Sequence, residues 1–87
     1  MKLKDIIDEI TALRNERSYR AALQISKLLD NNRRLFAGKI NDLDLDFMMK
    51  NFEELSYSHP KDHNTPGFIR DYDKYFESLL FHLNKIV

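Results

Sequence analysis

Acidic side chains at regular spacing are the first feature of this sequence that could do chemistry. Asp42, Asp44 and Asp46, followed by Glu53, imitate the ligands at positions 1, 3, 5 and 12 of a calcium-binding loop. Phe47 occupies the position where such a loop needs glycine for its sharp turn. We therefore interpret these acids as helix caps on a solvated acidic surface, and we predict no calcium site.

The histidines do not form a recognisable metal or catalytic site. His59, Asp62 and His63 could be metal ligands, but Pro60 breaks helical i, i+4 geometry and no further ligand lies nearby. His82 lies beside an apolar stripe, without a Ser or Cys nucleophile marked by its context. We predict a surface loop around Pro60, no metal, no cofactor and no enzymatic activity.

A tyrosine among acids indicates a protein-binding surface. Tyr75 lies off the main apolar stripe and is surrounded by Asp71, Asp73 and Glu77, which is the composition of a binding hot spot if the ring is exposed. Tyr57 is interpreted as a core or edge aromatic. The predicted partner-binding residues are Asp42, Asp44, Asp46, Glu53, Glu54, Asp71, Asp73, Tyr75 and Glu77.

The charges are balanced overall but separated along the chain. Residues 1–39 carry nine basic and five acidic side chains, and residues 40–87 carry five basic and nine acidic ones. Lys27, Arg33, Arg34 and Lys39 could contact a phosphate backbone. Ion pairs between these cations and acids of the second half explain them more simply than a phosphate backbone does. We therefore do not expect nucleic acid to be the partner.

The segments that carry the candidate site residues are predicted to be helices. The 87 residues include two glycines and two prolines, too few for a turn-rich β domain. A first helix has its apolar seam at Leu3, Ile6, Ile7, Ile10 and Leu13. Ser18 can cap a second helix, which ends either near Asn31 or near Gly38.

Two more helices follow in the acidic half. Acids from residue 42 to residue 46 favour a third helix start, and Leu45, Met48, Phe52 and Leu55 share a face with Phe47 and Met49 on its flanks. Thr65 and Pro66 predict the start of a last helix. Its apolar stripe contains Phe68, Ile69, Tyr72, Phe76, Leu79, Leu80, Leu83 and Ile86.

Together these patterns predict an all-α fold, a compact antiparallel four-helix bundle forming one domain over residues 1–87. The chain has no cysteine, no apolar run of membrane-spanning length and no uninterrupted signal-peptide core. We therefore expect a soluble cytoplasmic protein.

Residues 45–72 contain the motifs Leu45-Asp46, Phe52, His59-Pro60, Thr65-Pro66 and Ile69. With these motifs the segment resembles the small immunity proteins that protect bacteria from nuclease colicins. In that family an acidic helix ends in a His-Pro pair and the last helix opens at Ser-Pro. The family places a Tyr-Tyr-Pro helix between them, where this sequence has only KDHN, so no contact residues are carried over from that helix. Helical immunity proteins of other systems, including contact-dependent inhibition, are similar in size and composition.

The resemblance implies a protein that binds its toxin through an acidic face, with Asp44, Asp46, Glu53 and Glu54 on the corresponding helix. We therefore predict an immunity or antitoxin-type protein that occludes the basic substrate-binding surface of a toxin. We expect this toxin to be a nuclease. The alternatives are a nucleic-acid-binding or regulatory adaptor using Arg33, Arg34 and Lys39, and a self-assembling helical bundle. A homodimer is left open.

Overall fold

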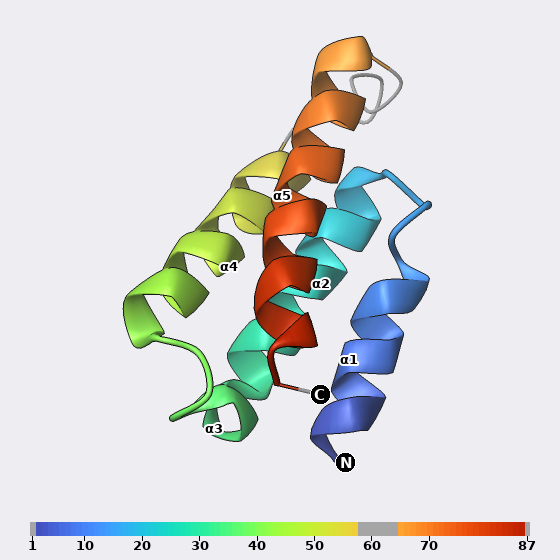
Figure 1. Ribbon diagram of the computed structural model, residues 1–87. Coiled ribbons are helices and arrows are strands. Elements are labelled where there is room, and N and C mark those ends of the chain that lie inside the picture. The colour runs from blue at the N-terminus through green and yellow to red at the C-terminus, as the bar shows by residue number, and fades with distance from the viewer. Residues whose placement is uncertain (1, 58–64, 87) are drawn as a thin grey trace.

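The chain is mainly helical in the part that the computed structural model describes, residues 2–57 and 65–86. Within these residues there are five helices and no strand, which confirms the all-α class (Figure 1). The helices are α1 (Leu3–Ala12), α2 (Tyr19–Asn31), α3 (Arg33–Phe36), α4 (Asp42–Ser56) and α5 (Pro66–Asn84). The short α3 was not predicted, so the expectation of four helices was wrong in number.

Ser18 and Thr65 cap helices as predicted, whereas α4 is capped by the Asn41 side chain and not by one of the acids that follow it. The Ser18 hydroxyl accepts a hydrogen bond from the Ala21 backbone N–H at the start of α2. Thr65 caps α5 in the same way through the Phe68 N–H, with Pro66 at the first turn. Each cap satisfies a backbone donor that has no acceptor inside its own helix.

The chain between α2 and α4 contains both of the helix ends considered from sequence. The Asn32 side chain donates to the Leu28 carbonyl at 2.8 Å, and α2 ends beside it. The single turn of α3 then buries Phe36. Gly38 follows with φ of 78°, the left-handed conformation that closes a helix. Asn31 therefore ends α2, and Gly38 closes α3.

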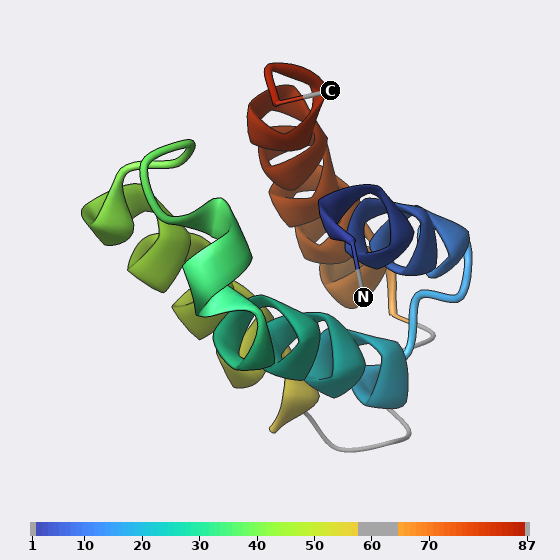
Figure 2. The same cartoon turned by 90° about the horizontal axis from the view of Figure 1, so that it is seen from below.

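The four longer helices surround one core, seen from below in Figure 2. An aromatic cluster joins α4 to α5: Tyr72 is stacked between Phe68 and Phe76, and the Phe52 ring meets Tyr72 edge-on with centroids 6.0 Å apart. The remaining buried core side chains are Ile6, Ile7, Ile10, Ala21, Ala22, Ile25, Leu29, Phe36, Ile40, Leu45, Met48, Leu55, Leu79 and Leu83. In the described part of the chain, no helix has both the length and the apolar character needed to cross a membrane.

Two polar contacts tie the connection between α1 and α2 to α5. Arg17 Nε donates to Asp73 Oδ1 at 2.9 Å and Arg17 Nη2 to Asp73 Oδ2 at 3.3 Å, which makes the pair bidentate. The Tyr72 hydroxyl donates to the Leu13 carbonyl at 2.6 Å, and burial raises the pKa of this tyrosine well above its ordinary value. Arg17 itself has φ of 46°, unusual for a residue with a side chain. The α1–α2 connection is thus held at a fixed place on α5.

Candidate functional site: the acidic surface of α4

Four of the predicted carboxylates lie exposed along α4. They belong to Asp42, Asp44, Glu53 and Glu54, and among residues 2–57 and 65–86 none of them forms a salt bridge. Asp42 and Asp44 lie in the first turn, where the helix dipole stabilises negative charge. The backbone is helical from Asp42 onward, with Asn41 as its cap, so these acids do not form a calcium-binding loop.

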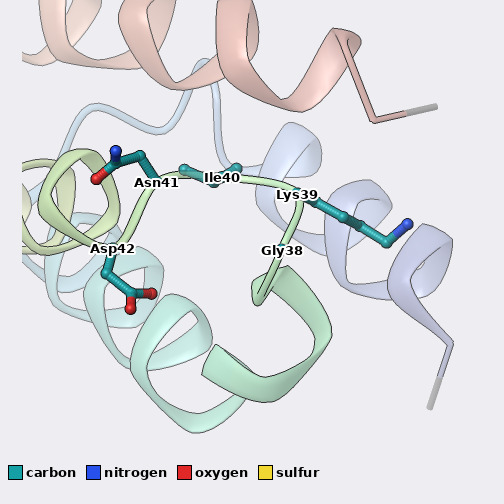
Figure 3. A pocket seen from close by; sticks show the side chains of 5 residues that line it. All are labelled: Gly38, Lys39, Ile40, Asn41 and Asp42. Carbon is teal, nitrogen blue, oxygen red and sulfur yellow. The ribbon is translucent and has the colours of Figure 1, made fainter.

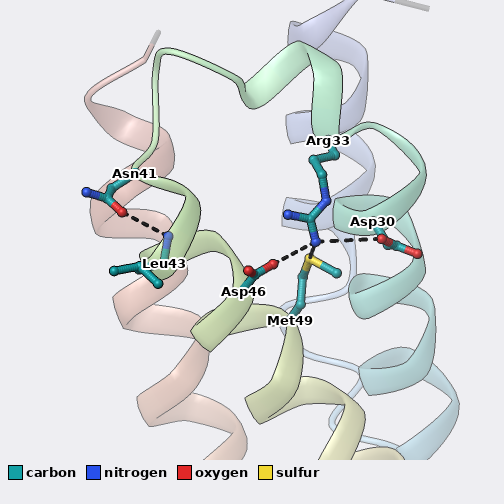
Figure 4. A network of polar contacts seen from close by, with 6 residues as sticks. All are labelled: Asp30, Arg33, Asn41, Leu43, Asp46 and Met49. Carbon is teal, nitrogen blue, oxygen red and sulfur yellow. Dashed lines mark hydrogen bonds and ion pairs between the residues drawn. The ribbon is translucent and has the colours of Figure 1, made fainter.

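Asp46 is engaged within the molecule. Arg33 Nη2 donates to Asp46 Oδ1 at 2.6 Å and lies 3.8 Å from Asp30 Oδ1 and 3.5 Å from the Met49 sulfur (Figure 4). The hydrogen bond to Asp46 is the main reason that the pKa of Arg33 is raised. The expectation that cations of the first half contact acids of the second half is confirmed for Arg33. Asp46 is consequently less available to a partner than the other α4 acids.

A hollow of about 430 Å³ follows the C-terminal half of α4. It is lined by Asp46, Met49, Lys50, Glu53, Glu54 and Tyr57. The Tyr57 side chain is 72% exposed, and its hydroxyl donates to Glu53 Oε1 at 2.8 Å. This hydrogen bond is the largest cause of the raised pKa of Tyr57. Sequence analysis treated Tyr57 as a core or edge residue, although its spacing of four from Glu53 would place the two side chains together on a helix.

The segment between α3 and α4 forms a second hollow, lined by Gly38, Lys39, Ile40, Asn41 and Asp42 (Figure 3). Ile40 is buried and anchors this segment to the core. The Asn41 side chain is already used, because it accepts the Leu43 N–H at 2.8 Å. Lys39 and Asp42 point apart in Figure 3, so their charges do not converge on one ligand.

The predicted site residues of α5 do not form one exposed surface. Asp73 is paired with Arg17, and Asp71 lies 3.9 Å from its neighbour Arg70. Tyr75 is half-buried, with its ring 6.2 Å from that of Phe52, so the expectation of an exposed tyrosine was wrong. The reason is that α4 packs against this side of α5. Asp73 reaches Arg17 in the α1–α2 connection while Tyr75 reaches toward α4, and Glu77 is the exposed acid of this group without a salt bridge to a described residue.

Two apolar side chains of α4 face outward instead. Leu43 is 77% exposed and Phe47 is 67% exposed, although Phe47 was expected at the flank of the buried face. The helical period alone could have indicated that both side chains are exposed. Leu43 and Phe47 are one turn apart, and they lie on the side of α4 away from its buried residues Leu45, Met48 and Phe52.

The described residues contain no group of three or more His, Cys, Asp or Glu side chains placed to hold a metal ion. The predicted surface loop with His59, Asp62 and His63 lies outside the described residues. His82 is half-buried, and its ring is 5.7 Å from that of Phe81 in an edge-on arrangement.

Comparison with known proteins identifies no relative: no family model, no curated protein and no solved structure matches the chain. The likeness of residues 45–72 to colicin immunity proteins therefore stays a prediction. Function has to be inferred from the geometry and charge of the α4 surface.

Proposed function

We propose that this protein is an immunity or antitoxin-type protein that binds a cognate bacterial toxin and neutralises it. The acidic surface of α4 would cover the basic substrate-binding surface of the toxin, which we take to be a nuclease. The observation that carries the proposal is the row of exposed carboxylates without salt-bridge partners in the described chain, those of Asp42, Asp44, Glu53 and Glu54.

The mechanism is charge mimicry. A nuclease holds the phosphates of its substrate with Lys and Arg side chains, and carboxylates on a rigid helix can occupy the same positions. Complementary charge of this kind speeds association and excludes wrong partners. In this proposal α1, α2, α4 and α5 form a compact antiparallel four-helix bundle that keeps α4 straight, and the protein acts in the cytoplasm, where it meets the toxin.

The two alternative functions have less support. An adaptor that binds nucleic acid would use Arg33, but this side chain is already held by Asp46 and Asp30. The other cations of the predicted set, Lys27, Arg34 and Lys39, are exposed. The alternative of a self-assembling bundle was based on the many apolar side chains of the last helix. Most of these side chains are buried in the core of the single chain.

Co-expression tests the proposal. The probe is the protein encoded by the reading frame adjacent to this gene, produced in a bacterium with and without the present chain. We expect the neighbour alone to stop growth and the pair to grow normally. Growth arrest that this chain does not relieve, or a neighbour that is harmless, would refute the proposal.

A charge variant links protection to α4. Asp44→Asn, Glu53→Gln and Glu54→Gln combined should weaken toxin binding at least about tenfold, since close charge pairs across an interface couple by roughly 1.5 kcal/mol or more. The matched control changes three acids of the other half, Asp8→Asn, Glu9→Gln and Glu16→Gln, and should bind normally. Calorimetric titration measures both, and equal affinities would remove α4 from the interface.

A further inference from the structure

Leu43 and Phe47 form an exposed apolar pair on the outer side of α4. Their side chains are 77% and 67% exposed, and a separation of four residues makes them neighbours on the helix surface. A single exposed leucine is ordinary in a folded protein. An exposed aromatic ring beside an exposed leucine is a compact apolar patch, which is the composition of an interface centre.

The surface of α4 is net acidic around this pair. Asp42 and Asp44 flank Leu43 in the chain, and both are exposed without a salt bridge to any described residue. Farther along the helix, Glu53 and Glu54 are also exposed without a salt bridge to a described residue, and Lys50 is the one cation of α4.

We infer that Leu43 and Phe47 anchor a docking site for a basic protein partner, with Asp42 and Asp44 as its acidic rim. An apolar centre inside a charged rim is the arrangement in which a few buried side chains carry most of the binding energy. The partner then presents an apolar recess bordered by Lys or Arg. The identity of the natural partner, a toxin, rests on the proposed function. The inference assigns the central apolar contact to Leu43 and Phe47 of α4, where the sequence had suggested Tyr75 of α5.

A second copy of this chain is a poor occupant of the same site. A symmetric dimer places the same patch on both sides of the interface. Both sides of the interface would then carry the same net acidic charge, and like charges disfavour association. Charge therefore selects a basic partner over self-association.

A synthetic amphipathic helical peptide of lysine and leucine is a probe with the required chemistry. Titrated into the isotope-labelled protein at low salt, it should shift the backbone NMR signals of α4 around Leu43 and Phe47. Leu43→Ser combined with Phe47→Ser should weaken this binding at least about tenfold, because hot-spot side chains contribute on the order of 1–2 kcal/mol or more each. Both side chains face solvent, so this variant should keep its helix content and melting temperature.

The matched control removes the same kinds of side chain elsewhere. Leu23→Ser combined with Phe81→Ser should change the affinity by no more than about twofold, and a peptide of glutamate and leucine should produce no shifts at α4. The inference is overturned if the basic peptide does not bind, if its shifts centre on another helix, if both double variants bind alike, or if Leu43 and Phe47 instead mediate a dimer in sedimentation equilibrium. No toxin is used, so this experiment and the co-expression test fail independently.

Discussion

Tyr72 joins two parts of the molecule that are distant in sequence. Its ring is stacked between Phe68 and Phe76 in α5, and its hydroxyl donates to the Leu13 carbonyl at the end of α1. The hydroxyl is the donor in this bond, so the bond requires the protonated form. Burial raises the pKa of Tyr72 because an ionised phenolate would lose its hydration there.

Because folded Tyr72 keeps its proton, the free energy of unfolding depends on pH in the alkaline range. The unfolded chain releases the tyrosine proton from about pH 10, while folded Tyr72 keeps it, so its contribution to stability is complete below that pH and declines as pH rises further. At neutral pH, Tyr72→Phe should lower the free energy of unfolding by about 1 kcal/mol through the lost hydrogen bond. Above about pH 10 the variant should lose less stability than the natural protein. Urea unfolding at both pH values measures this, and identical alkaline losses would contradict it.

Sequence reasoning identified individual side chains well where their role is local. The caps Ser18 and Thr65 each act on a backbone N–H three residues away, and the structure confirms both. It failed for Phe47, although the helical period already places this residue on the side of α4 away from the buried face. It also failed for Tyr75, which lies at the edge of the apolar stripe of α5 and is covered by Phe52 of α4. At such an edge, helical periodicity gives the angle of a side chain, but the placement of the neighbouring helix decides whether that angle is buried.

At the scale of elements, α3 shows why the boundary after α2 was ambiguous. Its bounds, Arg33–Phe36, are too short for any hydrophobic period to appear in the sequence. Gly38 was nevertheless a correct signal, because its positive φ is a local requirement. The four longer helices were predictable because each has at least two turns of apolar spacing.

The two glycines offer a matched test of this boundary. A Cβ added at either Gly38 or Gly67 meets no atom within 4 Å, so only backbone preference differs. Gly38→Ala should destabilise the protein by roughly 1 kcal/mol or more, because φ is 78° there. Gly67→Ala, in the first turn of α5, should stabilise it by about 0.4–1 kcal/mol. Urea unfolding of both variants should give changes of opposite sign, and changes of the same sign would contradict the assigned conformations.

At the scale of the whole molecule, the separated charges of the sequence are partly neutralised by folding. Arg17 with Asp73 and Arg33 with Asp46 each join the basic first half to the acidic second half. These pairs use one acid of α5 and one of α4. Among the described acids of the second half, those that remain exposed and without salt bridges are four on α4 and Glu77 alone on α5, which is why the proposed partner surface lies on α4.

The stability of the molecule depends on the aromatic cluster between α4 and α5. Phe76 is 1% exposed, stacks on Tyr72 and meets Phe52 edge-on. Phe76→Ala should lower the free energy of unfolding by roughly 3–5 kcal/mol, which is the usual cost of replacing a fully buried phenylalanine with alanine. A domain of this length has on the order of 5 kcal/mol in total, so the variant should keep at most about 2 kcal/mol and be marginally stable at room temperature.

Phe81→Ala is the control for this prediction, because it removes the same side chain from the same helix at a position that is 59% exposed. It should change the free energy of unfolding by no more than about 1 kcal/mol, including the loss of the contact with Lys85. Circular dichroism during urea unfolding measures both variants. If the two substitutions cost the same, the aromatic cluster is not the core of this molecule, and the rigid α4 surface on which partner binding depends would lose its support.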